Sequence, residues 1–77
     1  MKIRLSTIEQ VKEFAQISSK FNGDIYINQL NIHASASSIM ELFSLNLLEE
    51  LDMQIASGTA EDIDELCNQL QELGVII

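Results

Sequence analysis

Ile25-Tyr-Ile-Asn-Gln-Leu-Asn-Ile-His-Ala-Ser35 is the stretch that decides the fold of this chain of 77 residues. Apolar and polar side chains alternate along it, as they do in strands with one buried face. The apolar positions are Ile25, Ile27, Leu30, Ile32 and Ala34. We therefore predict two strands joined by a tight reversal at residues 29–31, with Asn31 holding the positive φ that such a reversal requires.

A helix is predicted before this hairpin, following a short strand over residues 2–5. Ser6 precedes Glu9 by three positions, which is the spacing of a capping box, so the helix should begin at Ser6. Asn22 and Gly23 both tolerate the left-handed conformation that often ends a helix. The expected apolar stripe consists of Ile8, Val11, Ala15 and Ser18, flanked by Phe14, Ile17 and Phe21.

Three further elements are predicted after the hairpin. Ser38 and Glu41 form a second capping-box pattern, which opens a short helix from Ile39 to about Ser44. Residues 51–56 alternate again and predict a strand. Thr59 is placed to cap a last helix, and Gly74 to close it. The apolar positions of that helix, Ile63, Leu66, Leu70 and Leu73, form one stripe.

The predicted order is strand, helix, strand, strand, short helix, strand, helix. Helices on one face of a four-stranded antiparallel sheet make a two-layer, open-faced α+β sandwich. A chain of 77 residues is short enough for one such unit, so we predict a single domain over residues 1–77.

The distribution of charge excludes several classes of partner. The net charge is −8, and all four basic residues, Lys2, Arg4, Lys12 and Lys20, fall within the first 20 positions. Without a basic stripe we expect no nucleic-acid partner and no membrane partner. The single cysteine cannot form an internal disulfide, and no signal-peptide pattern is present, so we expect a cytoplasmic protein. No clustering of potential ligands suggests a metal or another cofactor.

The chain resembles a known family along essentially its whole length, and two segments carry the resemblance most specifically. Ser18-Ser-Lys-Phe-Asn-Gly-Asp-Ile25 and Ser38-Ile-Met-Glu-Leu-Phe-Ser-Leu45 are similar to the histidine-containing phosphocarrier protein (HPr) of the bacterial sugar phosphotransferase system. That family carries a phosphoryl group on a histidine at the start of its first helix. When the family pattern is aligned with this sequence, its histidine position falls on Thr7. The nearby arginine position falls on Glu9 and the proline position on Gln10.

These replacements remove the chemistry of the carrier. A phosphothreonine ester is too inert for reversible transfer, and Glu9 would repel a phosphate that the family's arginine would neutralise. The resemblance therefore implies an HPr-like, non-catalytic regulatory or protein-binding module rather than an enzyme. The alternative is a phosphocarrier or phosphoacceptor protein of the phosphotransferase system that is modified at Ser38.

Ser38 has two interpretations at this stage. Many Gram-positive members of the family carry a regulatory phosphoserine just before a matching Ile-Met pair. A helix cap is the other interpretation, because Glu41 completes the capping-box spacing and would repel a phosphate.

The resemblance also indicates where a protein partner would bind. The family docks partners on a patch that corresponds here to Ile39, Met40, Phe43 and Leu47. We also expect Lys12 and Lys20, on the polar face of the first helix, to provide basic contacts for an acidic partner surface. We expect the protein to be a monomer that binds another protein, such as a phosphotransferase-system or regulatory protein. Neither the single histidine, His33, nor Cys67 has neighbours that suggest chemistry, so we expect a surface histidine on an edge strand and a packed thiol.

Overall fold

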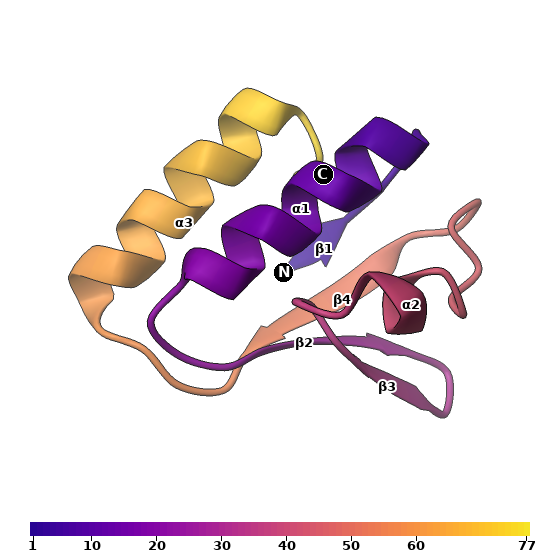
Figure 1. Cartoon of the computed structure of the whole chain (residues 1–77), viewed down its shortest axis with the longest axis horizontal. Coiled ribbons are helices and arrows are strands. Elements are labelled where there is room, and N and C mark those ends of the chain that lie inside the picture. Colours follow the sequence, from indigo (N-terminus) through magenta and orange to yellow (C-terminus); the bar gives the residue numbers. More distant parts are fainter.

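A computed structural model describes all residues, 1–77, and contains the seven predicted elements in the predicted order. Figure 1 shows α1 and α3 lying side by side over the sheet, with the short helix α2 beside the hairpin of β2 and β3. The elements are β1 (Lys2–Ile3), α1 (Ile8–Lys20), β2 (Ile25–Gln29), β3 (Ile32–Ser35), α2 (Ile39–Leu42), β4 (Leu51–Ile55) and α3 (Ala60–Leu73).

The four strands form one sheet in the order β1-β4-β2-β3, and every neighbouring pair is antiparallel. Strands β2 and β4 turn Ile27 and Met53 inward, where the helices cover them. The predicted two-layer α+β sandwich is therefore confirmed. Strand β3 lies at one edge of the sheet, so its exposed His33 is the edge-strand histidine that the sequence predicted.

The β2–β3 hairpin closes through a two-residue turn, because Gln29 pairs with Ile32. Leu30 holds the positive φ of 53°, so the prediction that Asn31 would hold it is wrong. A positive φ at the first turn residue is the pattern of a type II′ turn. Leu30 is 98% exposed and Ile32 is also exposed, and of the three inward positions predicted for the second strand only Ala34 is buried.

Helix α1 begins one residue later than predicted. Thr7, not Ser6, is the N-cap, and its Oγ1 accepts a hydrogen bond from the Gln10 N–H at 3.1 Å. The Gln10 side chain returns the contact by accepting from the Ser6 N–H at 2.7 Å. Ile8 is the first residue of the helix and is exposed, so its predicted place in the apolar stripe is also wrong.

Gly23 has a different role from the predicted left-handed cap. Helix α1 ends at Lys20, with Phe21 as an extended C-cap, and Gly23 does not have a positive φ. A Cβ on Gly23 would lie 2.1 Å from the carbonyl oxygen of Ser57 and 2.7 Å from the Phe21 ring. Glycine is therefore required because the chain after β4 passes directly against this position.

The core lies between the sheet and the two long helices. Helix α3 supplies Leu66 and Leu70, and Gly74 ends it with the predicted left-handed φ of 81°. Phe14 is the largest of the fully buried side chains. The buried apolar residues are Ile3, Leu5, Val11, Phe14, Ala15, Ile25, Ile27, Ala34, Ala36, Leu42, Leu45, Leu51, Met53, Leu66, Leu70 and Val75.

The residues after α3 add to the sheet, which the sequence analysis did not anticipate. Ile76 forms an antiparallel bridge with Ile3. The Arg4 N–H donates to the Val75 carbonyl at 2.8 Å, and the Ile77 N–H donates to the Lys2 carbonyl at 3.2 Å. This short segment covers the outer edge of β1, so β1 is paired on both sides.

Candidate protein-binding site

The start of α1 is the place where the resembling family carries its phosphohistidine. Here Thr7 is exposed, and its hydroxyl is already used to accept the Gln10 N–H. Glu9 is exposed in the first turn, and the Gln10 amide reaches the Leu73 carbonyl at 3.5 Å. The contacts of Thr7 are those of an ordinary helix cap.

Helix α2 is a single turn that Ser38 caps. The Ser38 Oγ accepts a hydrogen bond from the Glu41 N–H at 3.4 Å. The expected return contact from the Glu41 carboxylate is absent, because the Ser38 N–H donates to the Ser35 carbonyl at 3.1 Å. Only half of the predicted capping box is formed. The helix also ends at Leu42, two residues before the predicted end.

The outer side of α2 is apolar. Leu42 is fully buried and anchors the turn to the core, whereas Ile39, Met40 and Phe43 are exposed, Met40 at 83% and Phe43 at 46%. A helix of one turn cannot bury all of its sides, so anchoring Leu42 leaves these three in solvent. They are the side chains that the sequence analysis assigned to partner binding.

The loop after α2 differs from the prediction at two neighbouring residues. Leu47 is only partly buried and packs against the core, so it is less available than predicted. Leu48 is 87% exposed, and the sequence analysis missed it. An apolar side chain in an irregular loop gives no periodic signal, so only the folded loop reveals which of the two leucines faces water.

The buried side chain of Gln29 holds this loop in place. Its amide nitrogen donates to the Asn46 carbonyl at 2.8 Å, and its amide oxygen accepts from the Asn46 N–H at 2.7 Å. The Asn46 side chain then accepts from the Leu48 N–H at 3.2 Å. This paired amide contact joins the end of β2 to the loop and so fixes the position of Leu48.

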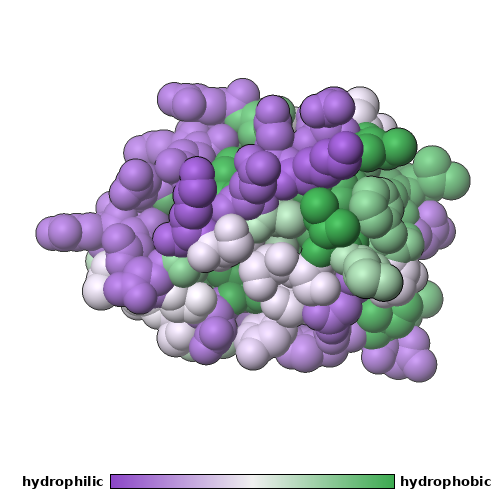
Figure 2. All heavy atoms as spheres, in the orientation of Figure 1, coloured by the Kyte–Doolittle hydropathy of each residue, from purple (hydrophilic) through white to green (hydrophobic).

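These exposed side chains share one end of the molecule, which we call the apolar end. Figure 1 shows α2, the loop that follows it and the start of α1 at the same end of the molecule, where the turn between β2 and β3 also lies. Figure 2 shows apolar atoms gathered over that end, whereas most of the opposite end is polar. The apolar end consists of Ile8, Ile39, Met40, Phe43 and Leu48. Clusters of exposed apolar side chains of this kind mark interaction sites.

A shallow groove borders the apolar end. It has a volume of about 290 Å³ and lies between α1 and the start of α2. Lys12 and Ile39 line it from opposite sides. Lys20, which the sequence analysis also placed near the partner, instead lines a separate hollow with Asp62 and Glu65 of α3.

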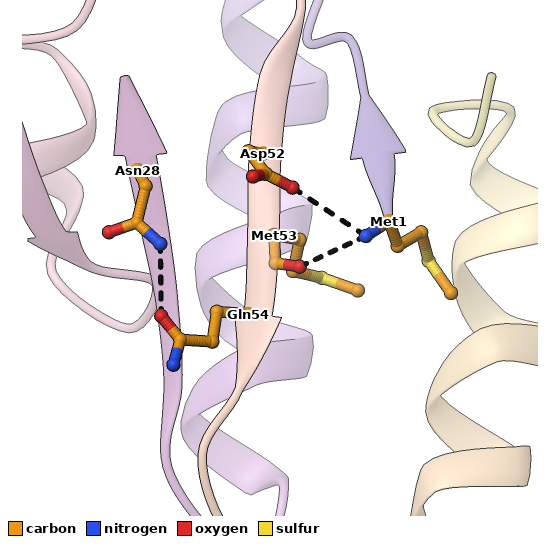
Figure 3. A network of polar contacts seen from close by, with 5 residues as sticks. All are labelled: Met1, Asn28, Asp52, Met53 and Gln54. Carbon is orange, nitrogen blue, oxygen red and sulfur yellow. Dashed lines mark hydrogen bonds and ion pairs between the residues drawn. The ribbon is translucent and has the colours of Figure 1, made fainter. Parts of the chain in front are cut away.

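The uncovered face of the sheet is polar. Figure 3 shows Asn28, Asp52 and Gln54 on this face with the helices behind the strands. The Asn28 amide donates to the Gln54 side chain at 3.0 Å, and the Met1 ammonium lies 3.6 Å from Asp52. The polar groups of these side chains are paired by this hydrogen bond and this ion pair, and we assign no binding role to them.

The remaining candidates for chemistry lie apart from one another. His33 stacks on Tyr26 with 4.4 Å between the ring centroids, and its Nδ1 contacts the Asn28 side-chain oxygen. Cys67 is a partly buried free thiol on α3. Nowhere do three potential metal ligands come together. None of the helices has the length and apolar character needed to cross a membrane.

Replacing the cap of α2 should weaken the fold. We expect Ser38→Ala to lower the free energy of unfolding by about 1 kcal/mol, because the Glu41 N–H would lose its partner. Urea denaturation followed by circular dichroism measures this change. Ser37→Ala is the matched control, since the exposed Ser37 hydroxyl contacts only that of Ser35. Equal stability of the two variants would contradict the capping role.

Comparison with known proteins gives matches among solved structures. No protein-family model and no curated protein matches the sequence. HPr-C-His from Thermoanaerobacter tengcongensis matches with a TM-score of 0.73 at 21% identity, over 95% of this chain and 91% of that chain. Crh from Bacillus subtilis, described as a catabolite repression protein that forms an intertwined dimer with a swapped domain, matches with a TM-score of 0.65 at 24% identity, over 94% of this chain and 85% of that chain. The chain described here therefore has the fold of HPr and Crh.

Proposed function

We propose that this protein is an HPr-like regulatory module that binds another protein through its apolar end and does not carry phosphate. The observation that carries the proposal is the exposure of Met40, Phe43 and Leu48 around a buried anchor, Leu42. Binding energy at protein interfaces is concentrated in a few large side chains near the centre of a patch. Met40 and Phe43 are of the right type and are already presented by a fixed turn.

The start of α1 supports the non-catalytic part of the proposal. A relay needs a group whose phosphorylated form is poised between donor and acceptor, and the phosphate ester of Thr7 would be too inert to meet that need. Glu9 also adds a negative charge next to the position where a phosphate would sit. We therefore propose a protein that is not an enzyme, requires no cofactor and acts in the bacterial cytoplasm.

Phosphotransfer gives the first test. After incubation with phosphoenolpyruvate and the general phosphotransferase enzyme, the protein should remain unmodified in intact-mass spectrometry, whereas a genuine HPr gains one phosphoryl group. Thr7→His should not restore full transfer, because Glu9 remains where the family has an arginine. Appearance of an acid-labile phosphate on the unmodified chain would overturn the non-catalytic assignment.

The alternative role, phosphorylation at Ser38, can be tested in the same way. The Ser38 hydroxyl caps α2, and the neighbouring Glu41 would repel an added phosphate. We therefore expect no transfer from the serine kinase that acts on HPr. Stoichiometric phosphorylation that Ser38→Ala abolishes would favour the alternative.

Substitution within the apolar end tests the binding role. We expect Met40→Ser to reduce capture of a native-lysate partner by at least about tenfold, since a central side chain commonly contributes about 2 kcal/mol or more. Ile77→Ser is the control, because Ile77 is also a large exposed apolar side chain and lies beside β1, at the opposite edge of the sheet from β3 and α2. If both substitutions have the same effect, the binding surface lies elsewhere.

The oligomeric state is part of the proposal. We propose a monomer, in which the apolar end is open to a different protein. Crh is described as a swapped dimer, so the mass in solution should be measured by light scattering before any partner is added. A stable dimer that Met40→Ser dissociates would identify a second copy of the chain as the occupant.

A further inference from the structure

We propose that the partner of the apolar end presents an apolar centre surrounded by basic side chains. This inference rests on the proposed binding function and adds the chemical class of the partner. It comes from the charges that surround the apolar end and from the absence of any group that neutralises them.

The rim of the apolar end is acidic. Glu41 lies on α2, Glu49 and Glu50 follow Leu48 in the same loop, and Glu9 lies beside Ile8 in the first turn of α1. All four side chains are exposed. The single ion pair of the structure joins the Met1 ammonium to Asp52, so none of the four glutamates has a cationic partner within the chain.

Basic residues are nearly absent from this region. Residues 39–50 and the first turn of α1 contain no lysine or arginine. Lys12 is one turn further along α1, and Lys20 lies beyond it in the hollow that it shares with Asp62 and Glu65. The earlier expectation that Lys12 and Lys20 would attract an acidic partner is therefore reversed, because such a partner would meet glutamates first.

Charge alone does not select this surface, because α3 is also acidic. Glu61, Asp64 and Glu65 are exposed on α3, but no large apolar side chain between Leu48 and Ile77 is exposed. Protein interfaces combine an apolar centre with a polar rim, and complementary rim charges steer the partner and fix its orientation. Only the apolar end has both features, so a partner with both should bind there.

Three synthetic helical peptides test the inference. The first carries leucines on one face and lysines on the other, the second replaces the lysines by glutamates, and the third keeps the lysines and replaces the leucines by serines. Each is titrated into the isotope-labelled protein at low salt and followed by NMR. We expect only the leucine–lysine peptide to shift the amide signals of residues 8–9 and 39–50.

Two triple variants of equal net charge separate local from bulk electrostatics. Glu41→Gln/Glu49→Gln/Glu50→Gln removes three charges from the rim of the apolar end, and Glu61→Gln/Asp64→Asn/Glu65→Gln removes three from α3. We expect the first variant to bind the leucine–lysine peptide about tenfold more weakly and the second to stay within about twofold of the parent. The affinity of the first should also depend less on salt.

The outcomes distinguish the inference from the proposed function. Equal weakening in the two triple variants, or equal binding of the leucine–glutamate peptide, would overturn the basic-rim partner but leave the apolar end as a binding surface. Binding that persists unchanged in Met40→Ser, or that shifts the signals of α3 in place of those of residues 39–50, would overturn both.

Discussion

Phe14→Ala should remove most of the free energy of unfolding of this domain and bring it close to unfolding at room temperature. Phe14 is fully buried between α1 and the sheet, and truncating a buried phenylalanine costs about 3–5 kcal/mol. Small domains have a total free energy of unfolding of about 5–15 kcal/mol, and a chain of 77 residues lies toward the lower end. Circular dichroism during urea denaturation should show a transition that is lost or shifted to very low urea.

Phe43→Ala removes the same atoms from the apolar end and serves as the matched control. Because Phe43 is 46% exposed, we expect its removal to change the free energy of unfolding by less than about 1 kcal/mol. Partner binding should fall while the fold persists. If Phe43→Ala destabilises the domain as much as Phe14→Ala does, Phe43 belongs to the core and the apolar end loses its central side chain.

Gly23→Ala should destabilise the fold strongly, although it adds only one methyl group. The added Cβ would lie 2.1 Å from the Ser57 carbonyl oxygen, which belongs to the backbone and cannot rotate away. Forcing atoms into a packed site costs about 1–3 kcal/mol and occasionally more. Thermal melting should therefore show a large fall in the midpoint, with the loop between β4 and α3 displaced.

Gly74→Ala supplies the comparison for the preceding variant. Gly74 has a positive φ of 81°, but nothing lies within 4 Å of a Cβ built there. The loss of folding free energy in Gly74→Ala should therefore come from backbone strain alone and amount to about 1–2 kcal/mol. A larger loss of stability in Gly74→Ala than in Gly23→Ala would show that close approach to Ser57 is not what requires glycine at position 23.

The order of the elements and the fold could be predicted because each long element has a repeated signal. Strand β4 alternates over five residues and α3 carries its apolar stripe over several turns, so neighbouring residues support the same conclusion. The left-handed end of α3 at Gly74 was predicted for a similar reason. Glycine directly after an apolar stripe has one common structural meaning.

Features that depend on one residue, such as a helix cap or a positive φ, could not be predicted from a repeated pattern. Ser6 with Glu9 and Thr7 with Gln10 both have the spacing of a capping box, and only the packing of α1 decides that Thr7 is the cap. Leu30 takes a positive φ in the two-residue turn that the pairing of Gln29 with Ile32 leaves to Leu30 and Asn31. The buried contact of Gln29 with Asn46 joins residues 17 positions apart, so no local pattern predicts it.

The candidate site was only partly predictable for the same physical reason. Ile39, Met40 and Phe43 were assigned from a resemblance, and the sequence contained no signal for their exposure. Ile8 was expected in the apolar stripe of α1, but it is the first residue of that helix and is exposed. Leu48 is exposed because its loop is held by Gln29, which lies in a different strand.

The pairing of Ile76 with Ile3 has a consequence for how fast this protein folds. Strand β1 lies between β4 and the residues after α3, so its contacts join segments about as distant in sequence as this chain permits. Contacts of high sequence separation require closure of a long loop before any energy is gained, and they slow folding. The β2–β3 hairpin, whose strands are adjacent, can pair early. Docking of β1 together with the final residues is then the late event that completes the sheet.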